Sequence, residues 1–210
     1  MAHGHNCNGS CDHSHDDPAG DSVGVAYSLY SKIDLNRLEC LNEAVDGSAK
    51  TIFKPWNERL DNENYVESDA DEELLFNIAF TGNIKLKGII VRGANDDSHP
   101  SSLKIYKNRP NMSFDDTSLE PDQEFELQRD TMATAEYPTK IVKFATVNHL
   151  TLYFPKNFGD DTTRIYYIGL KGDFTAAQRD AILIANYELA SNPADHKVNL
   201  FESTKNTINH

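Results

Sequence analysis

The sequence predicts an all-β fold, a β-sandwich or barrel, and three observations lead to this class. Roughly seven to nine short apolar runs alternate with period two, as half-buried strands do. Gly, Asn and Asp separate these runs, and helical spacing is rare. The 210 residues, of which 39% are hydrophobic, can build one core with a tail at each end.

The first elements are a polar tail and a short helix. Residues 1–24 contain Gly, Ser, Asn, His and Asp but almost no large apolar side chain, so this segment cannot bury enough surface to fold alone. Leu38, Leu41 and Val45 follow with helical spacing, and Gly47 is a typical stop. We therefore expect a disordered tail and then a short helix over 38–45.

Strand patterns follow. Apolar residues alternate over 74–80 and again over 84–90, and Thr81-Gly82-Asn83 between them predicts a β-hairpin. Further strands are predicted at 103–105, at 124–128, at two places within 140–154, at 165–169 and at 182–184. After Pro193 the sequence is polar. The predicted organisation is a tail at 1–24, one domain at 25–197 and a second tail at 198–210.

Charge and motif content exclude several function classes. The net charge is −13, with 33 acidic against 20 basic residues, and no Lys/Arg cluster suited to nucleic acid is visible. No apolar run approaches the roughly 20 residues of a membrane helix, and the N-terminus lacks a signal-peptide core. G-x-S-x-G, H-E-x-x-H, C-x-x-C and phosphate-binding glycine loops are missing. We expect an intracellular protein that is not an enzyme and has no cofactor.

The N-terminal tail concentrates possible metal ligands. Imidazole and thiolate groups suit zinc or copper. Yet nothing apolar would pack behind them, and structural zinc sites close around a folded unit. A flexible tract that takes up metal weakly is the favoured interpretation, and a metal-handling function is the alternative. The candidate ligands are His3, His5, Cys7, Cys11, His13 and His15.

An acidic run at 66–76, "VESDADEELLF", is the strongest candidate for a binding surface. It does not match an EF-hand loop, because the sixth position counted from Asp69 is Leu74 instead of Gly. Three interpretations remain: a charged turn before a buried strand, a docking surface for a basic partner, or a metal site. The candidate partner-binding residues are Glu67, Asp69, Asp71, Glu72 and Glu73.

Other polar residues are interpreted mainly as structural. Carboxylates at 96–97, 115–116 and 160–161 are typical turn formers, and they would make a cation site only if their loops converge. Trp56 is expected to cover one end of the core, although a lone Trp also suits sugar stacking. Cys40 is expected to be buried and inert, and His149 to lie in a strand.

Several segments resemble the PITH domain family, whose name stands for proteasome-interacting thioredoxin. They are "ECLNE" at 39–43, "ESDADEELLFNIAFTGNIKLKGIIVRG" at 67–93, "LKIYKNRPNMSFDD" at 103–116, "KIVKFATVNHLTLYFPKNFGDDTTRIYYIGLKG" at 140–172 and "NYELASNPADHK" at 186–197. The resemblance implies a single jelly-roll β-sandwich similar to galactose-binding domains.

The resemblance also implies a function. Members of this family join a thioredoxin domain to a module that docks on the regulatory particle of the 26S proteasome. This chain has no redox C-x-x-C, so reductase activity does not carry over. We expect a non-enzymatic, proteasome-associated adaptor or regulator in the cytoplasm and nucleus. It is expected to be a monomer without nucleic-acid or membrane partners. By fold analogy alone, carbohydrate binding is an alternative function.

Overall fold

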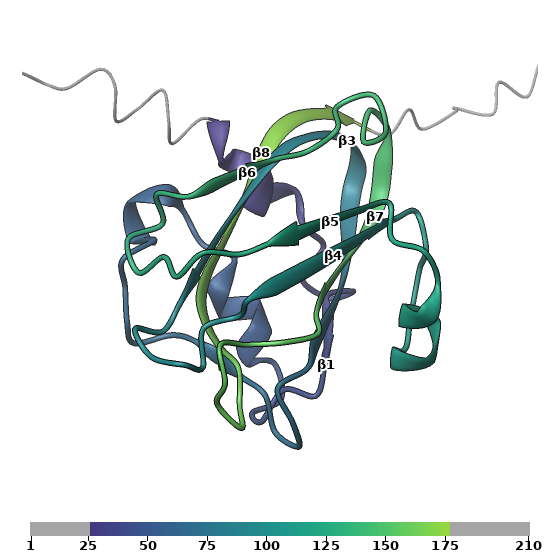
Figure 1. Ribbon diagram of the computed structural model, residues 1–210. Coiled ribbons are helices and arrows are strands. Elements are labelled where there is room, and N and C mark those ends of the chain that lie inside the picture. Colours follow the sequence, from purple (N-terminus) through teal and green to yellow (C-terminus); the bar gives the residue numbers. More distant parts are fainter. Residues whose placement is uncertain (1–25, 177–210) are drawn as a thin grey trace, which may run out of the picture. The chain divides into compact units, whose positions relative to one another are not determined.

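The computed structural model describes residues 26–176, which form an antiparallel β-sandwich around one long strand, β3 (Leu74–Gly93). The first half of β3 pairs with β1 (Glu39–Leu41) and β7 (Val147–Phe154). β4 (Ser102–Lys107) and β5 (Gln123–Glu126) extend this sheet beyond β7. The second half pairs with β6 (Glu136–Pro138) and β8 (Arg164–Ala176), and β2 (Val66–Glu67) pairs with β8. Figure 1 shows this arrangement.

The predicted hairpin at 74–93 is wrong, because β3 is continuous. Its two halves pair with different strands, and the register shifts between Ala79 and Ile84, where the strand passes from one sheet to the other. The alternation of apolar residues is present in both halves, as predicted. A turn sequence makes a hairpin only when its two arms are each other's best partners. Here β7 and β8 supply longer apolar partners for the arms.

The predicted helix over 38–45 is also wrong. Residues 39–41 form strand β1, in which Cys40 lies opposite Phe76 of β3. Gly47 has a φ of +80° and precedes the 3₁₀ helix η2 (Ser48–Ile52). The glycine therefore begins a helix instead of ending one. Apolar spacing over eight residues is a weak signal, and pairing with a buried strand outweighs it.

Most of the later predictions hold. The strands expected at 103–105, 124–128, 150–154 and 165–169 correspond to β4, β5, β7 and β8. The strand expected at the start of 140–154 is wrong, since Lys140–Phe144 form a turn in which the Phe144 N–H donates to the Lys140 carbonyl at 3.1 Å. The run at 182–184 and both predicted tails lie outside the described residues.

The core lies between two layers, one built on the first half of β3 with β7 and the other built on its second half with β8. Phe76, Phe144, Phe154 and Ile165 are fully buried in it. Burying each such side chain contributes about 1.5–3 kcal/mol relative to exposure. Three more short 3₁₀ helices are present: η1 (Ser28–Lys32) precedes β1, while η3 (Trp56–Glu58) and η4 (Phe114–Ser118) lie between strands. The predicted all-β class, a single jelly-roll sandwich, is confirmed.

Across residues 26–176, no helix is long and apolar enough to cross a membrane.

Candidate functional site

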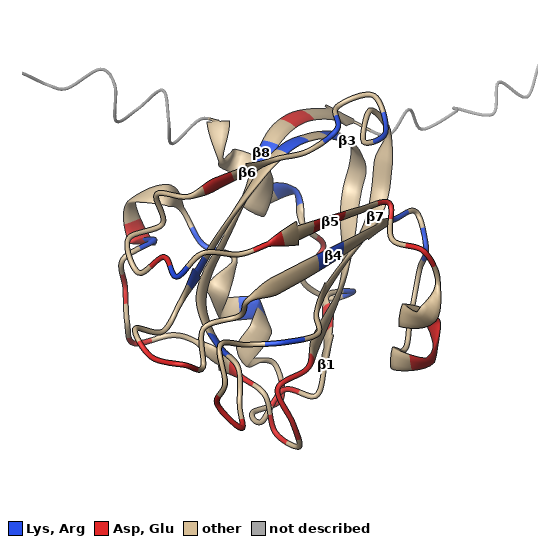
Figure 2. Ribbon diagram, in the orientation of Figure 1, with Lys and Arg blue, Asp and Glu red and all other residues tan. Residues whose placement is uncertain are grey.

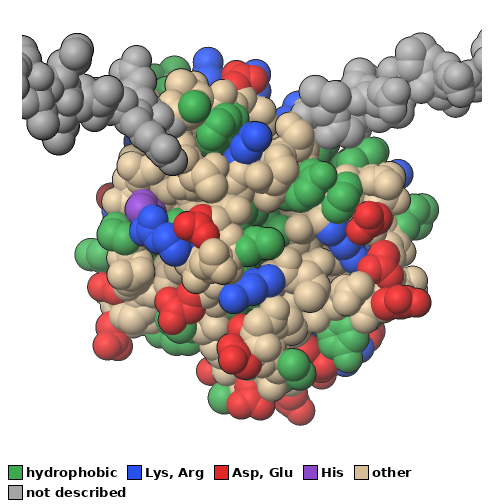
Figure 3. Space-filling model, turned by 180° about the vertical axis from the view of Figure 1, so that it is seen from behind, with side chains coloured by type: hydrophobic (Ala, Val, Ile, Leu, Met, Phe, Trp, Pro, Cys, Tyr) green, Lys and Arg blue, Asp and Glu red, His purple; other side chains and the backbone are tan. Residues whose placement is uncertain are grey.

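Three loops meet at the end of the sandwich where β3 both begins and ends. The Ser68 N–H donates to the Thr163 carbonyl at 3.0 Å, and the Phe158 N–H donates to the Asp97 carbonyl at 3.0 Å. These bonds bring residues 67–73, 96–99 and 157–163 together. Acidic residues mark the loops at this end in the ribbon view, and acidic side chains gather there on the surface (Figures 2 and 3). We call this region the acidic end.

The acidic run contributes both structural and exposed carboxylates to the acidic end. Glu67 forms an ion pair with Arg164 at 2.8 Å. Asp71 accepts hydrogen bonds from the Asn42 amide and the Glu73 N–H. The Glu73 carboxylate accepts the Tyr153 hydroxyl at 2.9 Å, and burial together with this bond raises the Tyr153 pKa to about 12. These three carboxylates therefore stabilise the local structure, although Asp71 itself is exposed.

Asp69 and Glu72 are different. Asp69 is exposed and Glu72 is half-buried. Within the described part of the chain, neither carboxylate enters an ion pair. Of the five predicted partner-binding residues, these two are best placed to meet another molecule. That assignment stays a prediction.

A second acidic segment lies beside the first. Asp160 and Asp161 face Asp71 and Glu72 across an open cleft of about 670 Å³, with Lys156 also in its wall. Both Asp160 and Asp161 are exposed. From its sequence this pair is predicted to form turns, and to contribute to a cation site only if the loops converge. The pairing of 68 with 163, which sets the cleft, joins residues that are far apart in the chain, so no local pattern reveals it.

The loop that carries the second segment is held by its own polar groups. The Asn157 amide donates to the Asp160 and Thr162 carbonyls at 2.8 and 2.9 Å, and its oxygen accepts the Gly159 N–H at 2.9 Å. Gly159 has a φ of +127°, a conformation that side-chain-bearing residues rarely adopt. The loop therefore presents its two aspartates from a defined backbone.

The neighbouring loop at 96–99 has a structural role. Asp96 accepts the Ser98 N–H at 3.0 Å, and the Ser98 hydroxyl holds the Asp96 pKa below its usual range. His99 is fully buried; its Nε2 accepts the Asp130 N–H at 3.0 Å, and Nδ1 lies 2.8 Å from the Pro100 carbonyl. Burial lowers the His99 pKa, so the ring is neutral.

No group of three or more His, Cys, Asp or Glu side chains within residues 26–176 is placed to hold a metal ion. The convergence of acidic loops therefore makes a negatively charged surface. Asp115 and Asp116 belong to η4, where Asp116 forms a capping box with Ser113. The six candidate metal ligands between His3 and His15 lie outside the described residues.

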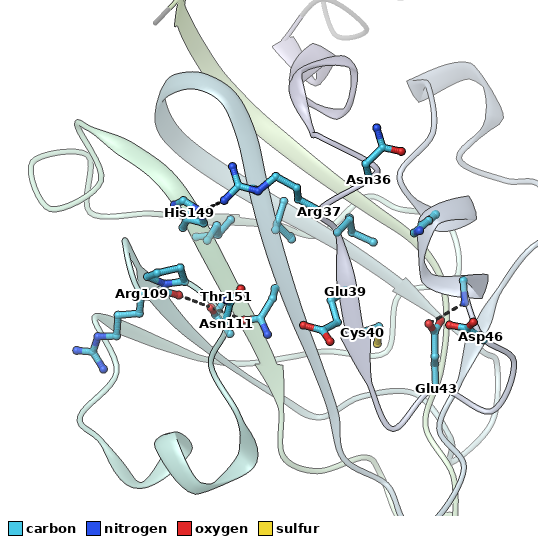
Figure 4. A pocket seen from close by; sticks show the side chains of 18 residues that line it. Asn36, Arg37, Glu39, Cys40, Glu43, Asp46, Arg109, Asn111, His149 and Thr151 are labelled. Atoms are coloured by element: carbon cyan, nitrogen blue, oxygen red, sulfur yellow. Dashed lines mark hydrogen bonds between the residues drawn. The ribbon is translucent and has the colours of Figure 1, made fainter.

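A groove of about 460 Å³ lies on the outer face of β1, β3 and β7 (Figure 4). The strand register places Glu39, Asn77 and Thr151 side by side across its floor. The buried Asn77 amide donates to the Met112 carbonyl at 2.8 Å, and its oxygen accepts the Thr151 hydroxyl at 3.1 Å. Asn77 and Thr151 therefore bond each other and the 109–112 loop, and their first role is to hold that loop against the sheet.

The side chains of the groove that could take part in chemistry, Cys40 and His149, have shifted pKa values. Cys40 is buried as predicted, and burial raises the pKa of its thiol, so it stays protonated at neutral pH. His149 lies in β7 as predicted, 2.9 Å from the Arg37 guanidinium. Burial and the positive charge of Arg37 lower the His149 pKa. The groove is suited to contact with another molecule more than to nucleophilic chemistry.

Trp56 covers one edge of the core, as predicted. Its ring stacks on Tyr27 with centroids 4.9 Å apart, and the Arg59 guanidinium lies 4.2 Å from the indole centroid. Tyr167 meets it edge-on at 6.5 Å. The indole is thus engaged by protein groups, which weakens its interpretation as a sugar-stacking platform.

Solved structures with a related fold include carbohydrate-binding modules from Clostridium perfringens. The family 32 module of NanJ in complex with galactose has a TM-score of 0.48 and 8% identity, covering 68% of this chain and 95% of that chain. The CBM32-3 module of a family 31 glycoside hydrolase has a TM-score of 0.46 and 15% identity, covering 72% of this chain and 98% of that chain. A likeness at this level carries no argument about a ligand.

The curated relatives are far more similar. A PITH domain-containing protein of Drosophila melanogaster is 57% identical over 210 residues, covering 99% of this chain and 100% of the relative. PITH domain-containing protein 1 of Homo sapiens is 55% identical over 201 residues, covering 94% and 95%. That of Dictyostelium discoideum is 42% identical over 205 residues, covering 97% and 98%. The PITH domain family matches residues 19–191, and the chain therefore belongs to this family.

Proposed function

We propose that this PITH domain is a non-enzymatic interaction module that docks on the regulatory particle of the 26S proteasome through its acidic end. It acts as a monomeric adaptor or regulator in the cytoplasm and nucleus. Family membership supports the class of partner. The observation that carries the choice of surface is the convergence of two acidic segments, distant in sequence, around one cleft.

The charge distribution makes this end suitable for docking. Exposed carboxylates from two loops raise the local negative potential and steer association with a basic surface. Because the segments are tied by main-chain hydrogen bonds, little ordering entropy is lost when a partner arrives. Rim charges of this kind act mostly on the association rate and on its dependence on salt.

The chemistry of the other concavities supports a non-enzymatic role. On the groove floor Asn77 and Thr151 hydrogen-bond with each other, and Cys40 is a buried, protonated thiol. His99 is neutral and sealed inside the fold. The pKa shifts described above all have a cause in packing or in loop structure. They need no catalytic role to explain them.

A charge-reversal experiment tests the proposal. The variant Asp69→Lys, Glu72→Lys, Asp161→Lys changes exposed or half-buried carboxylates that enter no ion pair within the described residues. Full-length protein is titrated into purified 26S proteasome, and binding is measured by co-sedimentation. We expect affinity to fall at least tenfold, with a weaker dependence on salt, because the complementary charge is gone.

A matched variant separates a local effect from net charge. Asp115→Lys, Glu124→Lys, Glu126→Lys makes the same change in charge at exposed positions on η4 and β5. It should bind within about twofold of the wild type, because none of these side chains lines the cleft between the two acidic segments. Equal weakening by both variants would reject the acidic end as the docking surface. No binding by the wild-type protein would reject the proteasome as partner.

A further inference from the structure

The turn at 140–144 exposes two branched apolar side chains. Val142 is 93% exposed and Ile141 is 44% exposed, whereas Phe144, two residues further on, is fully buried in the core. The Lys143 N–H donates to the Lys140 carbonyl at 2.8 Å and closes the turn. Phe144 thus anchors a rigid turn that presents Ile141 and Val142 to the outside. We call residues 140–143 the apolar tip.

Lysines surround the apolar tip. Within it, Lys140 and Lys143 flank Ile141 and Val142 in sequence. The Leu86 N–H donates to the Phe144 carbonyl at 3.0 Å, which places the turn beside Lys85 of β3. Lys107, at the end of β4, donates from its ammonium group to the Lys143 carbonyl. Among the described residues these four lysines enter no ion pair, although Lys107 and Lys143 donate to the carbonyls of Lys143 and Asp122.

The apolar tip lies far from the acidic end. β3 begins next to the acidic run at Leu74 and reaches the level of the tip near Ile84, which pairs with Val147. About ten residues of strand at about 3.3 Å each separate the two ends by about 30 Å. The Debye length at physiological ionic strength is about 8 Å, so the acidic end does not neutralise these lysines. The acidic residues beside them include Asp122, whose carboxylate accepts the Lys107 N–H at 2.9 Å, and Asp173, which lies opposite Lys85. One rigid domain therefore carries two regions of opposite charge.

We infer that the apolar tip is a second docking contact on the same partner, where it enters an apolar pocket rimmed by carboxylates. This inference rests on the proposed function. Two aliphatic side chains on one convex turn match a single pocket, and the surrounding lysines match an acidic rim. Lys87 at the same end is paired with the exposed Asp173 at 2.7 Å. A surface with charges of both signs is better suited to bind another protein than to bind a uniformly anionic bilayer.

Because both contacts belong to one rigid domain, neither needs a high affinity of its own. Once the acidic end is bound, the apolar tip is held near its pocket at a high effective concentration, so the two contacts multiply in affinity. The spacing of about 30 Å also selects a large partner, because both surfaces must be present at that separation. This requirement fits a multi-subunit assembly such as a proteasome regulatory particle.

The test replaces the apolar tip without touching its anchor. Full-length Ile141→Ser, Val142→Ser is titrated into purified 26S proteasome beside the wild type and Leu119→Ser. Leu119 is 50% exposed, follows η4 and lies outside both the apolar tip and the segments that form the acidic end. We expect the tip variant to bind at least tenfold more weakly and Leu119→Ser to bind within twofold of the wild type. Circular dichroism should show equal thermal unfolding for all three.

The outcomes are distinct. Wild-type-like binding by the tip variant, together with weak binding by the charge reversal at the acidic end, overturns this inference and leaves the proposed function standing. No binding by the wild-type protein removes both. A parallel sedimentation with vesicles of phosphatidylcholine and phosphatidylserine tests whether the apolar tip binds a membrane surface instead. Binding to these vesicles that depends on Ile141 and Val142, without an effect on proteasome binding, would also overturn the inference.

Discussion

The acidic end and the apolar tip are two surface regions of one sandwich that are held in place in different ways. At the acidic end, loops are tied by polar groups: the Thr163 hydroxyl donates to the Glu72 carbonyl at 2.6 Å, and the Ser68 hydroxyl accepts the Thr163 N–H at 2.8 Å. At the apolar tip, main-chain hydrogen bonds close the turn, and one buried aromatic ring, Phe144, anchors it in the core.

The difference follows from what each region presents. The acidic loops run over the surface without ladder partners, so their buried main-chain groups need side-chain hydrogen bonds. Those bonds leave Asp69 and Asp161 facing solvent. The turn at the apolar tip also has hydrogen bonds, such as that from the Lys140 N–H to the Gln123 side chain at 2.8 Å, but it has in addition an apolar anchor in the core. Four changes test this contrast, and they are ordered by how strongly each should perturb the protein.

Removing the anchor should have the largest effect. Phe144→Ala deletes a fully buried ring and leaves a cavity, so we expect the free energy of unfolding to fall by about 3–5 kcal/mol. Urea unfolding followed by circular dichroism measures this loss. A loss below about 1 kcal/mol would show that the turn does not depend on this ring, and the contrast between the two regions would disappear.

Cutting a polar tie should cost less but affect binding. Thr163→Val keeps the side-chain volume and leaves the partly buried Glu72 carbonyl without its donor, which costs about 1–3 kcal/mol. Because Glu72 lines the acidic cleft, proteasome binding should weaken even where the variant is fully folded. Unchanged unfolding and unchanged affinity would mean that the hydroxyl does not position this loop. Thr146→Val, at an exposed position beside the apolar tip, is the matched control.

Acid should lower the free energy of unfolding through His99, which lies in one of the loops at the acidic end. Its folded-state pKa lies below the unfolded value of about 6.5, so the unfolded state binds the proton more readily. The stability that this group contributes is complete above about pH 6.5 and is lost as the pH falls through the folded-state pKa. Urea unfolding at pH 7.5 and 5.5 should show this loss in a protein that already carries His149→Asn, because the His149 pKa is lowered as well. Adding His99→Gln to that protein should flatten the difference.

Polar residues at the apolar tip should change stability least. Ile141→Ser, Val142→Ser alters exposed side chains, and we expect the free energy of unfolding to stay within about 0.5 kcal/mol of the wild type. Calorimetric melting of the pair measures it. A loss above about 1.5 kcal/mol would indicate that these side chains pack within the domain, and they could not then serve as a free contact.

Sequence patterns predicted the strands with strong alternation and missed those decided by pairing. Leu150, Leu152 and Phe154 share a buried face in β7, and the period-two signal was sufficient to place them. By contrast, Glu39–Leu41 is too short for any periodic signal, and it is a strand because β3 offers it a partner. The bend of β3 near Gly82 was misread as a hairpin for the same reason.

The candidate site shows the same division. The density of carboxylates between Glu67 and Glu73 is visible in the sequence, and so is the apolar pair at 141–142. Which carboxylates are engaged inside the fold is not visible. Glu67 pairs with Arg164, and Glu73 with Tyr153, across nearly a hundred residues of chain in the first case and eighty in the second. Nothing in the local pattern joins Asp160 and Asp161 to the acidic run.

The class of the domain, the strands that fill its core and the acidic character of one segment could all be read from the chain alone, because alternation and composition are local properties. Three other facts required the folded molecule: β3 spans both sheets, two acidic segments share one cleft, and Ile141 and Val142 stand exposed about 30 Å away. These facts depend on which distant strands pair, and strand pairing is settled by the burial of whole faces at once.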